Sequence, residues 1–334
     1  MSETQNISTM AEQLSADLFK WFKWKVSGSM NIDNECVIEN HRKNTHPSDI
    51  VFNYYDPYSG KRIYLNCDLK SYSKDSISKK NFTDVLTSLA MSIECPEISE
   101  DWKENYLMSD VESYEITGLL FIFNHDNQSK KLLKDILQKI KLKSIPLRKG
   151  QRITVIGPEE ISYFTNIVND LKDMKSREIF KSFDDYTFFY PDLSLKKRHN
   201  SNNDEWNNPA TIEYLTSPWM IVKYKNDRNN LDNYIIYYRG RGDSVDEFVY
   251  LIDTLSAYQL VTSENSVTVR LYQSHQKASI YFERAIEQYL QSWNMDSSRR
   301  DDLVNFKASS ITNIISTEYN QYEIGMGIRG WDDE

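Results

Sequence analysis

Asp68 and Lys70 place a carboxylate and an ammonium group two positions apart within YLNCDLKSYS, residues 64–73. If this apolar segment is a β-strand, alternate residues point to the same face, so the two charged groups lie side by side. The same spacing occurs three more times in the chain, at Asp101/Lys103, Asp170/Lys172 and Asp173/Lys175. Those pairs lie in an acidic segment or in a predicted helix, where residues i and i+2 point to different sides. The strand context therefore distinguishes Asp68 and Lys70 as a pair that can act together.

Asp49 supplies a second carboxylate close to this pair. It stands at the start of SDIVFNYY (48–55), which the turn sequence DPYSG separates from KRIYLNCDLKSY (61–72). Two β-branched and aromatic segments joined by such a turn predict a hairpin, which can bring Asp49 and Asp68 to one point. Two carboxylates and a backbone carbonyl, here that of Leu69, suit a hard cation such as Mg²⁺ or Mn²⁺. The neighbouring lysine can position a water molecule and offset the charge of a phosphate group.

One predicted helix precedes this hairpin and another follows it. Thr9 and Glu12 form a capping box for a helix over 9–24, and apolar residues at helical spacing predict a second helix over 78–94. In this order, the residues resemble the PD-(D/E)XK nuclease superfamily. Asp49 stands in "PSD" where the family usually has "PD", and Asp68-Leu69-Lys70 matches the (D/E)xK motif. Glu12 then corresponds to the carboxylate that the family carries on its first helix.

The resemblance covers about residues 8–180 and implies a metal-dependent nuclease with the restriction-endonuclease-like αβββαβ core. It implies Mg²⁺ or Mn²⁺ as the cofactor and the Leu69 carbonyl as a metal ligand beside two carboxylates. The catalytic residues that it implies are Asp49, Asp68, Lys70 and Glu12, of which Asp49 and Asp68 would also bind the metal. Such a nuclease joined to a further module is similar to proteins of bacterial antiphage defence. DNA is favoured as the substrate. An RNase with the same site and a non-catalytic scaffold that binds a protein partner remain alternatives.

The remaining elements of the first part predict an α/β domain with a mixed sheet flanked by helices. A short apolar segment, CVIEN, predicts a strand over 36–40, and the unbroken apolar run EITGLLFIFN predicts a strand buried on both faces over 115–124. A basic helix over 129–142, a strand over 152–157 and a helix that begins at Pro158 follow. We expect this nuclease-like domain to occupy residues 1–190.

Residues 191–334 predict a second, smaller α+β domain for partner or substrate recognition. It opens with a polar, Asn-rich linker, and its tyrosine-rich strands are expected to serve the core and an interface. The expected elements are a linker over 192–209, strands over 219–224, 234–239 and 267–272, helices over 244–260 and 276–293, and a terminal strand in YEIGMGIRGW.

Charge is unevenly distributed in this chain of 334 residues with a net charge of −9. Residues 94–115, which we expect to form an acidic loop, hold eight acids against one lysine, whereas residues 130–152 hold nine Lys and Arg against one Asp. Clustered cations bind phosphates, so the basic segment predicts salt-sensitive contact with nucleic acid. The residues expected to make such contacts are Lys79, Lys80, Lys139, Lys141, Lys143, Arg148 and Lys149. The negative net charge suggests a protein partner or a homo-oligomer that helps to bind DNA.

The cysteines and histidines do not predict a metal site. Three cysteines and five histidines are scattered without a CxxC, HxxxH or HxH pair, so we expect reduced thiols and no zinc. No stretch is long and apolar enough for a membrane span, and the first residues lack the layout of a secretory signal. These features favour the cytoplasm.

Overall fold

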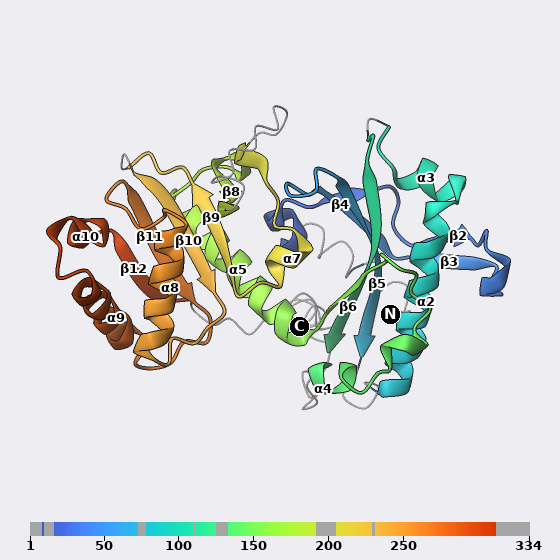
Figure 1. Ribbon diagram of the computed structural model, residues 1–334. Coiled ribbons are helices and arrows are strands. Elements are labelled where there is room, and N and C mark those ends of the chain that lie inside the picture. The colour runs from blue at the N-terminus through green and yellow to red at the C-terminus, as the bar shows by residue number, and fades with distance from the viewer. Residues whose placement is uncertain are drawn as a thin grey trace, which may run out of the picture. The chain divides into compact units, whose positions relative to one another are not determined.

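The computed structural model describes residues 9, 17–72, 78–109, 111–124, 133–191, 205–228 and 231–311. These residues form two compact units that divide between Thr165 and Asn166 (Figure 1). The boundary predicted from the sequence, between residues 190 and 191, separates two domains expected to fold independently. The division into compact units does not test whether they do, so this boundary stays a prediction.

A five-stranded mixed sheet forms the centre of the first unit, in the order β1-β4-β5-β6-β7. Strand β4 runs antiparallel to its two neighbours, β1 and β5, whereas β5, β6 and β7 run parallel to one another. The predicted hairpin is confirmed, because β4 pairs with β5 in antiparallel register. The strands of this unit are β1 (Lys25–Ser27), β2 (Ile32–Glu35), β3 (Thr45–Ser48), β4 (Ile50–Tyr55), β5 (Arg62–Tyr72), β6 (Tyr114–Asn124) and β7 (Ile153–Ile156).

Helix α2 covers part of one face of this sheet (Figure 1). Its Phe82 and Leu89 pack in one apolar cluster with Leu120 and Ile122 of β6. Ser78 caps α2 by accepting a hydrogen bond from the Asn81 amide. The helices and 3₁₀ turns (η) of the first part are η2 (Phe19–Phe22), η3 (Glu39–His41), α2 (Lys79–Glu94), η4 (Cys95–Glu97), α3 (Glu100–Tyr106), α4 (Leu133–Leu137), η5 (Leu142–Ser144) and α5 (Pro158–Ser176).

Aromatic side chains cover the other face. Phe19 of η2 packs edge-on against Phe52 of β4 and Phe121 of β6, and Phe22 contacts Phe164 of α5. Strand β6 is therefore buried on both sides, as its unbroken apolar sequence predicts. The α/β architecture with a mixed sheet is confirmed.

Three local predictions for this unit were wrong. No strand forms over 36–40, because β2 ends at Glu35, a hydrogen bond from the Cys36 amide to the Asn44 carbonyl closes the β2–β3 ladder, and the chain turns into η3. The acidic segment contains α3, whose Trp102 is buried although acids surround it. The basic helix predicted over 129–142 is shorter at its end than expected, because α4 stops at Leu137.

The helix predicted over 9–24 is described only in part. Its end is a 3₁₀ turn that stops at Phe22, because Lys23 adopts the left-handed conformation and β1 follows. Glu12 lies outside the described residues.

The second unit has its own five-stranded sheet, in the order β12-β11-β10-β9-β8. The predicted strand pair β9–β10 is antiparallel, whereas β10, β11 and β12 are parallel and are linked through helices. The elements are η6 (Phe183–Asp185), β8 (Tyr186–Phe188), η7 (Glu205–Asn207), α7 (Ile212–Leu215), β9 (Trp219–Tyr224), β10 (Asp232–Tyr238), α8 (Val245–Ala257), β11 (Asn265–Leu271), α9 (Ala278–Ser292), α10 (Ser297–Asp302) and β12 (Phe306–Ser310).

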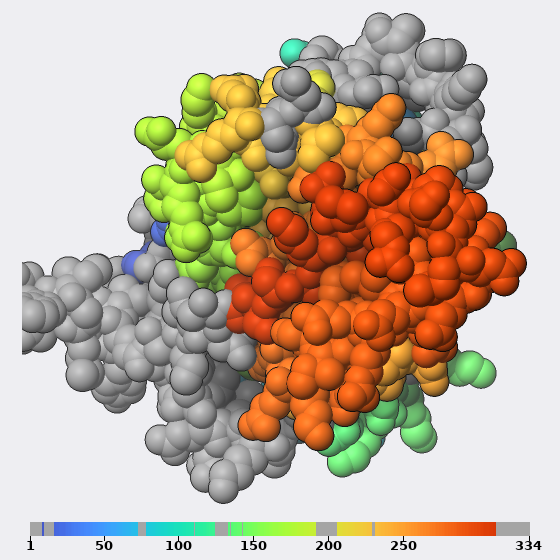
Figure 2. Space-filling model, turned by 90° about the vertical axis from the view of Figure 1, so that its left-hand side faces the viewer, coloured from blue at the N-terminus to red at the C-terminus, as the bar shows by residue number. Residues whose placement is uncertain are grey.

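The apolar core of the second unit lies between this sheet and two helices. Phe248 of α8 packs against Phe282 of α9, and both belong to one cluster with Tyr234 and Tyr238 of β10. Figure 2 looks onto this unit, where segments from α8 to β12 (orange to red) form much of the surface in view. The tyrosines of β10 therefore serve the core, as predicted. The predicted terminal strand and residues 192–204 lie outside the described residues, and no helix among the described residues could cross a membrane.

Candidate active site

The start of β4 and the second half of β5 bring Asp49 next to the predicted motif. Asp49 directly precedes β4, and its amide donates a hydrogen bond of 3.2 Å to the Cys67 carbonyl of β5. Strand β5 continues beyond this point to Tyr72, so its edge toward β4 no longer has a strand partner there. The Asp49 side chain fills the next position: its Oδ2 accepts a hydrogen bond of 2.7 Å from the Leu69 amide.

The Leu69 carbonyl faces the same edge of β5. The N–H and C=O groups of one residue in an extended strand point to the same side, and the Leu69 N–H points to Asp49. The backbone thus places a carbonyl oxygen on the side where the Asp49 carboxylate lies. This is the oxygen that the sequence predicts as a metal ligand.

Asp68 and Lys70 lie together on one face of β5. The Lys70 Nζ is 2.5 Å from the Asp68 Oδ1, and both side chains are partly exposed, Lys70 by 31% and Asp68 by 16%. The other face of the strand carries buried Cys67 and Leu69. Alternation along the strand therefore places the acid and the amine side by side.

The charge of Asp68 is close enough to change the pKa of Asp49. Burial raises the pKa of Asp49 to about 6, and the charge of Asp68 and a side-chain hydrogen bond with Asp68 add to this effect. The Leu69 amide and the Lys70 ammonium act in the opposite direction but do not cancel it. Two carboxylates that repel each other in this way form a place where a cation is stabilised.

Lys70 keeps its proton despite its partial burial. Burial alone would lower the pKa of Lys70, but the charges of Asp68 and Asp49 and the hydrogen bond to Asp68 outweigh it and raise the pKa. Lys70 is therefore an ammonium group at neutral pH, which can donate hydrogen bonds and stabilise negative charge but cannot accept a proton.

The donor set fits a hard divalent cation. Asp49, Asp68 and the Leu69 carbonyl offer oxygen atoms only, which Mg²⁺ and Mn²⁺ prefer. Mutual repulsion of the carboxylates gives a reason for a cation to bind here rather than elsewhere on the sheet.

A comparison with known protein families agrees with this geometry. Residues 1–160 match the family described as "GAPS4 protein PD-(D/E)XK nuclease domain". Residues 1–160 therefore form a domain of the PD-(D/E)XK nuclease superfamily. No curated protein and no solved structure matches the chain.

Within the PD-(D/E)XK domain, the other predicted site residues lie on the surface or outside the description. The predicted phosphate contacts are exposed, and Arg148 forms an ion pair with Glu94 at the end of α2. Glu12 is not described. The exposed residues are Lys79, Lys80, Lys139, Lys141, Lys143, Arg148 and Lys149. Their contact with nucleic acid and the catalytic roles of Asp49, Asp68 and Lys70 stay predictions.

A second group of potential ligands in the PD-(D/E)XK domain was not predicted from the sequence. Cys36, His41, His46 and Cys95 lie together, although motif spacing indicated scattered thiols and histidines. The signal in the sequence was weak: the first three residues recur at intervals of five, and Cys95 follows much later. Sulfur and imidazole ligands suit a different metal from the carboxylate site.

Proposed function

We propose that the PD-(D/E)XK domain cleaves nucleic acid, most simply DNA, by phosphodiester hydrolysis that depends on Mg²⁺ or Mn²⁺. The observation that carries this proposal is the convergence of Asp49, Asp68 and Lys70 at the second half of β5. Membership of the nuclease superfamily supports the same reaction class.

The residues of the site would have separate roles in this reaction. Asp49, Asp68 and the Leu69 carbonyl would hold the cation. When bound, the cation would supply Lewis-acid stabilisation of the phosphate and lower the pKa of water. Lys70, which is protonated, would donate hydrogen bonds to a phosphate oxygen or to the attacking water and would offset the charge that develops during cleavage.

The alternative, a non-catalytic scaffold that keeps the nuclease fold, predicts a different geometry. In such a scaffold, Asp49 would not need to face the motif, and Lys70 could pair with any nearby acid. Instead, Asp49 accepts from the Leu69 amide and shares a site with Asp68 and Lys70. Holding two carboxylates close together in a partly buried place costs free energy. Such an arrangement therefore supports a functional role rather than a structural one.

Plasmid cleavage tests the proposal. The full chain is incubated with supercoiled DNA or with RNA, with and without Mg²⁺, beside the variants Asp68→Asn and Lys70→Met. Loss of either group should slow cleavage by at least about a hundredfold, the scale of removing one electrostatic stabiliser of a transition state. The RNA arm decides between the two substrates.

The matched control changes the same residue types at the same spacing. Asp173 and Lys175 lie on α5, so Asp173→Asn with Lys175→Met should leave the rate unchanged. If Asp68→Asn and Lys70→Met cleave as fast as the parent protein, the proposed function is wrong.

We further propose that this nuclease acts in bacterial defence against phage, which the resemblance and the matched family support. On bacteria that express the parent chain, phage should form fewer plaques than on bacteria that express Asp68→Asn. Equal plaque counts would contradict the defence role.

A further inference from the structure

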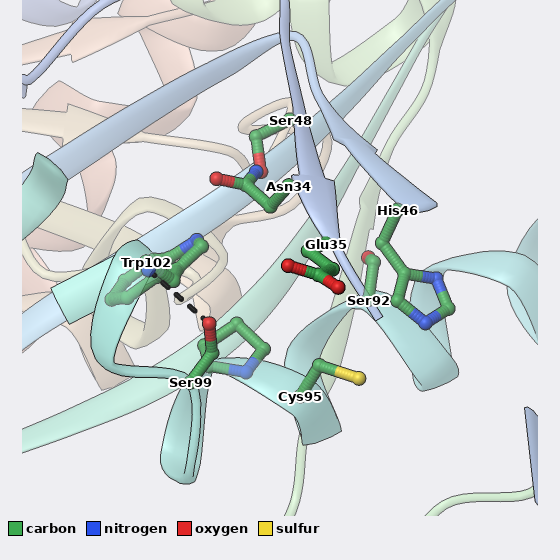
Figure 3. A pocket seen from close by; sticks show the side chains of 9 residues that line it. Asn34, Glu35, His46, Ser48, Ser92, Cys95, Ser99 and Trp102 are labelled. Carbon is green, nitrogen blue, oxygen red and sulfur yellow. Dashed lines mark hydrogen bonds between the residues drawn. The ribbon is translucent and has the colours of Figure 1, made fainter. Parts of the chain in front are cut away.

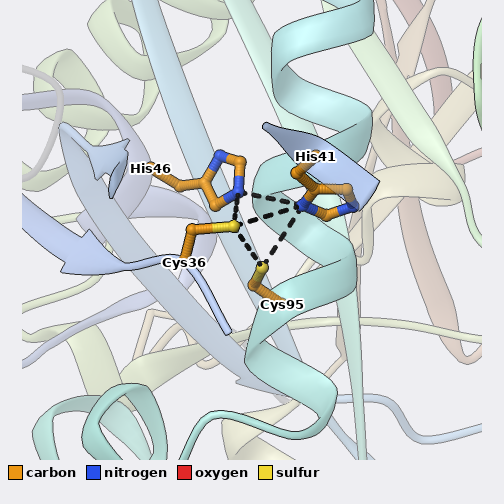
Figure 4. Close-up of side chains that lie close together, drawn as sticks. All are labelled: Cys36, His41, His46 and Cys95. Carbon is orange, nitrogen blue, oxygen red and sulfur yellow. Dashed lines mark hydrogen bonds between the residues drawn. The ribbon is translucent and has the colours of Figure 1, made fainter. Parts of the chain in front are cut away.

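Four side chains, three from residues 36–46 and one from the junction of α2 and η4, converge near the end of α2 (Figure 4). Cys36 follows β2, His41 ends η3, and His46 lies in β3. Cys95 comes from the opposite side, where α2 passes into η4. One potential ligand atom from each residue lies within 4.8 Å of the other three.

Five of the six distances between these atoms, 3.0–3.6 Å, are close to the edge lengths of a tetrahedron around zinc. Zn–S bonds of about 2.3 Å and Zn–N bonds of about 2.0–2.1 Å at tetrahedral angles place ligand atoms about 3.3–3.8 Å apart. The two sulfur atoms are 3.6 Å apart, and the His41 Nδ1 is 3.6 Å from the Cys36 Sγ and 3.4 Å from the Cys95 Sγ. The His46 Nε2 is 3.1 Å from the Cys36 Sγ and 3.0 Å from the His41 Nδ1.

Glu94 orients one of the imidazole rings. Its Oε2 lies 3.1 Å from the His41 Nε2, and Arg148 pairs with the same carboxylate. When the His41 Nε2 donates its hydrogen to Glu94, the neutral ring carries a lone pair on Nδ1, the atom that faces the two sulfurs. A carboxylate that holds a metal-binding histidine in this way is a common feature of zinc sites.

The cluster is largely enclosed by protein. His46 is 2% exposed, Cys95 3% and His41 9%, and only Cys36 is more open to solvent. His46 and Cys95 also border a hollow between β2, β3 and the end of α2, which is too narrow for a water molecule (Figure 3). Electron-rich atoms that face one another in such surroundings need a cation or hydrogen bonds to hold them together.

We propose that Cys36, His41, His46 and Cys95 bind one zinc ion with a structural role. Thiolate and imidazole ligands select zinc, and four protein ligands leave no position for a substrate. This site is chemically distinct from the oxygen ligands around Asp49 and Asp68, and its existence does not depend on nuclease activity.

The zinc ion would fix the β2–β3 sheet to the end of α2. A sheet of two strands is marginally stable alone, and among the described strands β2 and β3 pair only with each other. Bound zinc would add a link between this sheet and the helix that covers β5 and β6. Since β3 ends at Ser48, directly before Asp49, the same link would also support the strand that carries the first carboxylate of the candidate active site.

Metal analysis of the purified full chain tests the proposal. After expression with added zinc and gel filtration, the parent protein should contain about one zinc per chain. Cys95→Ser and His46→Gln should each lose it. Replacement by Co²⁺ should give the visible bands of a tetrahedral complex and a charge-transfer band from thiolate to cobalt.

Matched controls use the same residue types outside the cluster. Cys67→Ala and His275→Gln should retain the zinc, because Cys67 lies in β5 and His275 in the second unit. Asp68→Asn should also retain it, which separates this site from the proposed nuclease site.

The parent protein alone can overturn the proposal, even if a ligand variant fails to fold. A chain without zinc, or one in which mass spectrometry finds a Cys36–Cys95 disulfide, contradicts it. Zinc that persists in both Cys95→Ser and His46→Gln, or cobalt bands without thiolate character, contradicts the assigned ligands.

Discussion

Two buried carboxylates show how differently single residues are stabilised in this chain. Asp170 accepts a hydrogen bond of 2.9 Å from the Tyr237 hydroxyl, and its Oδ2 lies 3.4 Å from the Arg270 Nε. Asp49, in contrast, faces another carboxylate, and the Leu69 amide and the Lys70 ammonium offset the repulsion only in part. The fold thus supplies a guanidinium and a hydroxyl for Asp170, whereas at Asp49 the proposed cation would relieve the remaining repulsion.

Asp170 gives a prediction on pH and stability. Burial raises its pKa, with a contribution from Asp173, and Arg270, Tyr237 and Arg177 counteract this only in part. Since the folded state then binds a proton at a higher pH than the unfolded state does, lowering the pH stabilises the folded state. As the pH falls from 7 to about 4, the free energy of unfolding of the parent chain should therefore rise relative to that of Asp170→Asn. Urea denaturation of both proteins at each pH measures this difference. A difference that stays constant or falls would contradict the assignment.

At the scale of elements, α2 depends on close contact with β6. A Cβ atom on Gly118 of β6 would lie 2.9 Å from the Ile153 Cγ1 of β7 and 3.2 Å from the Leu89 Cγ of α2. Glycine at this position therefore allows the helix to approach the sheet.

Gly118→Ala should lower the free energy of unfolding by about 1–3 kcal/mol, the usual cost of an extra methyl group in a packed core. Thermal or urea denaturation measures the loss. In an Ile153→Ala background, the same change should cost less, because the closest contact has been removed. An equal cost in both backgrounds would show that this contact is not responsible.

Elements with a strong local pattern could be predicted from the sequence, and others could not. Strand β5 alternates apolar and polar residues, β4 and β5 flank a turn sequence, and Ser78 and Ser244 mark the starts of their helices as predicted. Helix α3 was missed because its two apolar contacts, Trp102 and Tyr106, stand among acids. β1 was missed because three residues show no periodicity.

The two clusters of potential metal ligands differ in the same respect. Asp49 and Asp68 belong to adjacent strands of one hairpin, so local pattern and pairing were enough to bring them together. Cys95 meets Cys36, His41 and His46 only because α2 packs beside β3, a tertiary contact that spacing along the chain does not contain.

At the scale of the whole molecule, the net charge of −9 contrasts with the proposed binding of a polyanion. The basic segment has to supply the local attraction, and Lys139, Lys141 and Lys143 are exposed. Each phosphate contact releases counterions, so binding by these lysines depends steeply on salt.

Reversal of all three lysines to glutamate should weaken DNA binding and reduce the slope of log affinity against log salt by up to about 3. Fluorescence anisotropy over a range of salt concentrations measures both effects. A matched control reverses the exposed Lys277, Arg284 and Lys307 of the second unit and changes the net charge equally. Equal losses in both proteins would show that net charge, and not the basic segment, governs binding.

The binding of one divalent cation by Asp49, Asp68 and the Leu69 carbonyl is tested most directly by anomalous diffraction. Crystals of the parent chain and of Asp68→Asn are soaked in Mn²⁺. We expect a peak between the two carboxylates and the carbonyl in the parent chain, and a lost or much weaker peak in the variant. No peak in the parent chain, with the two carboxylates turned away from each other, would contradict the proposed binding.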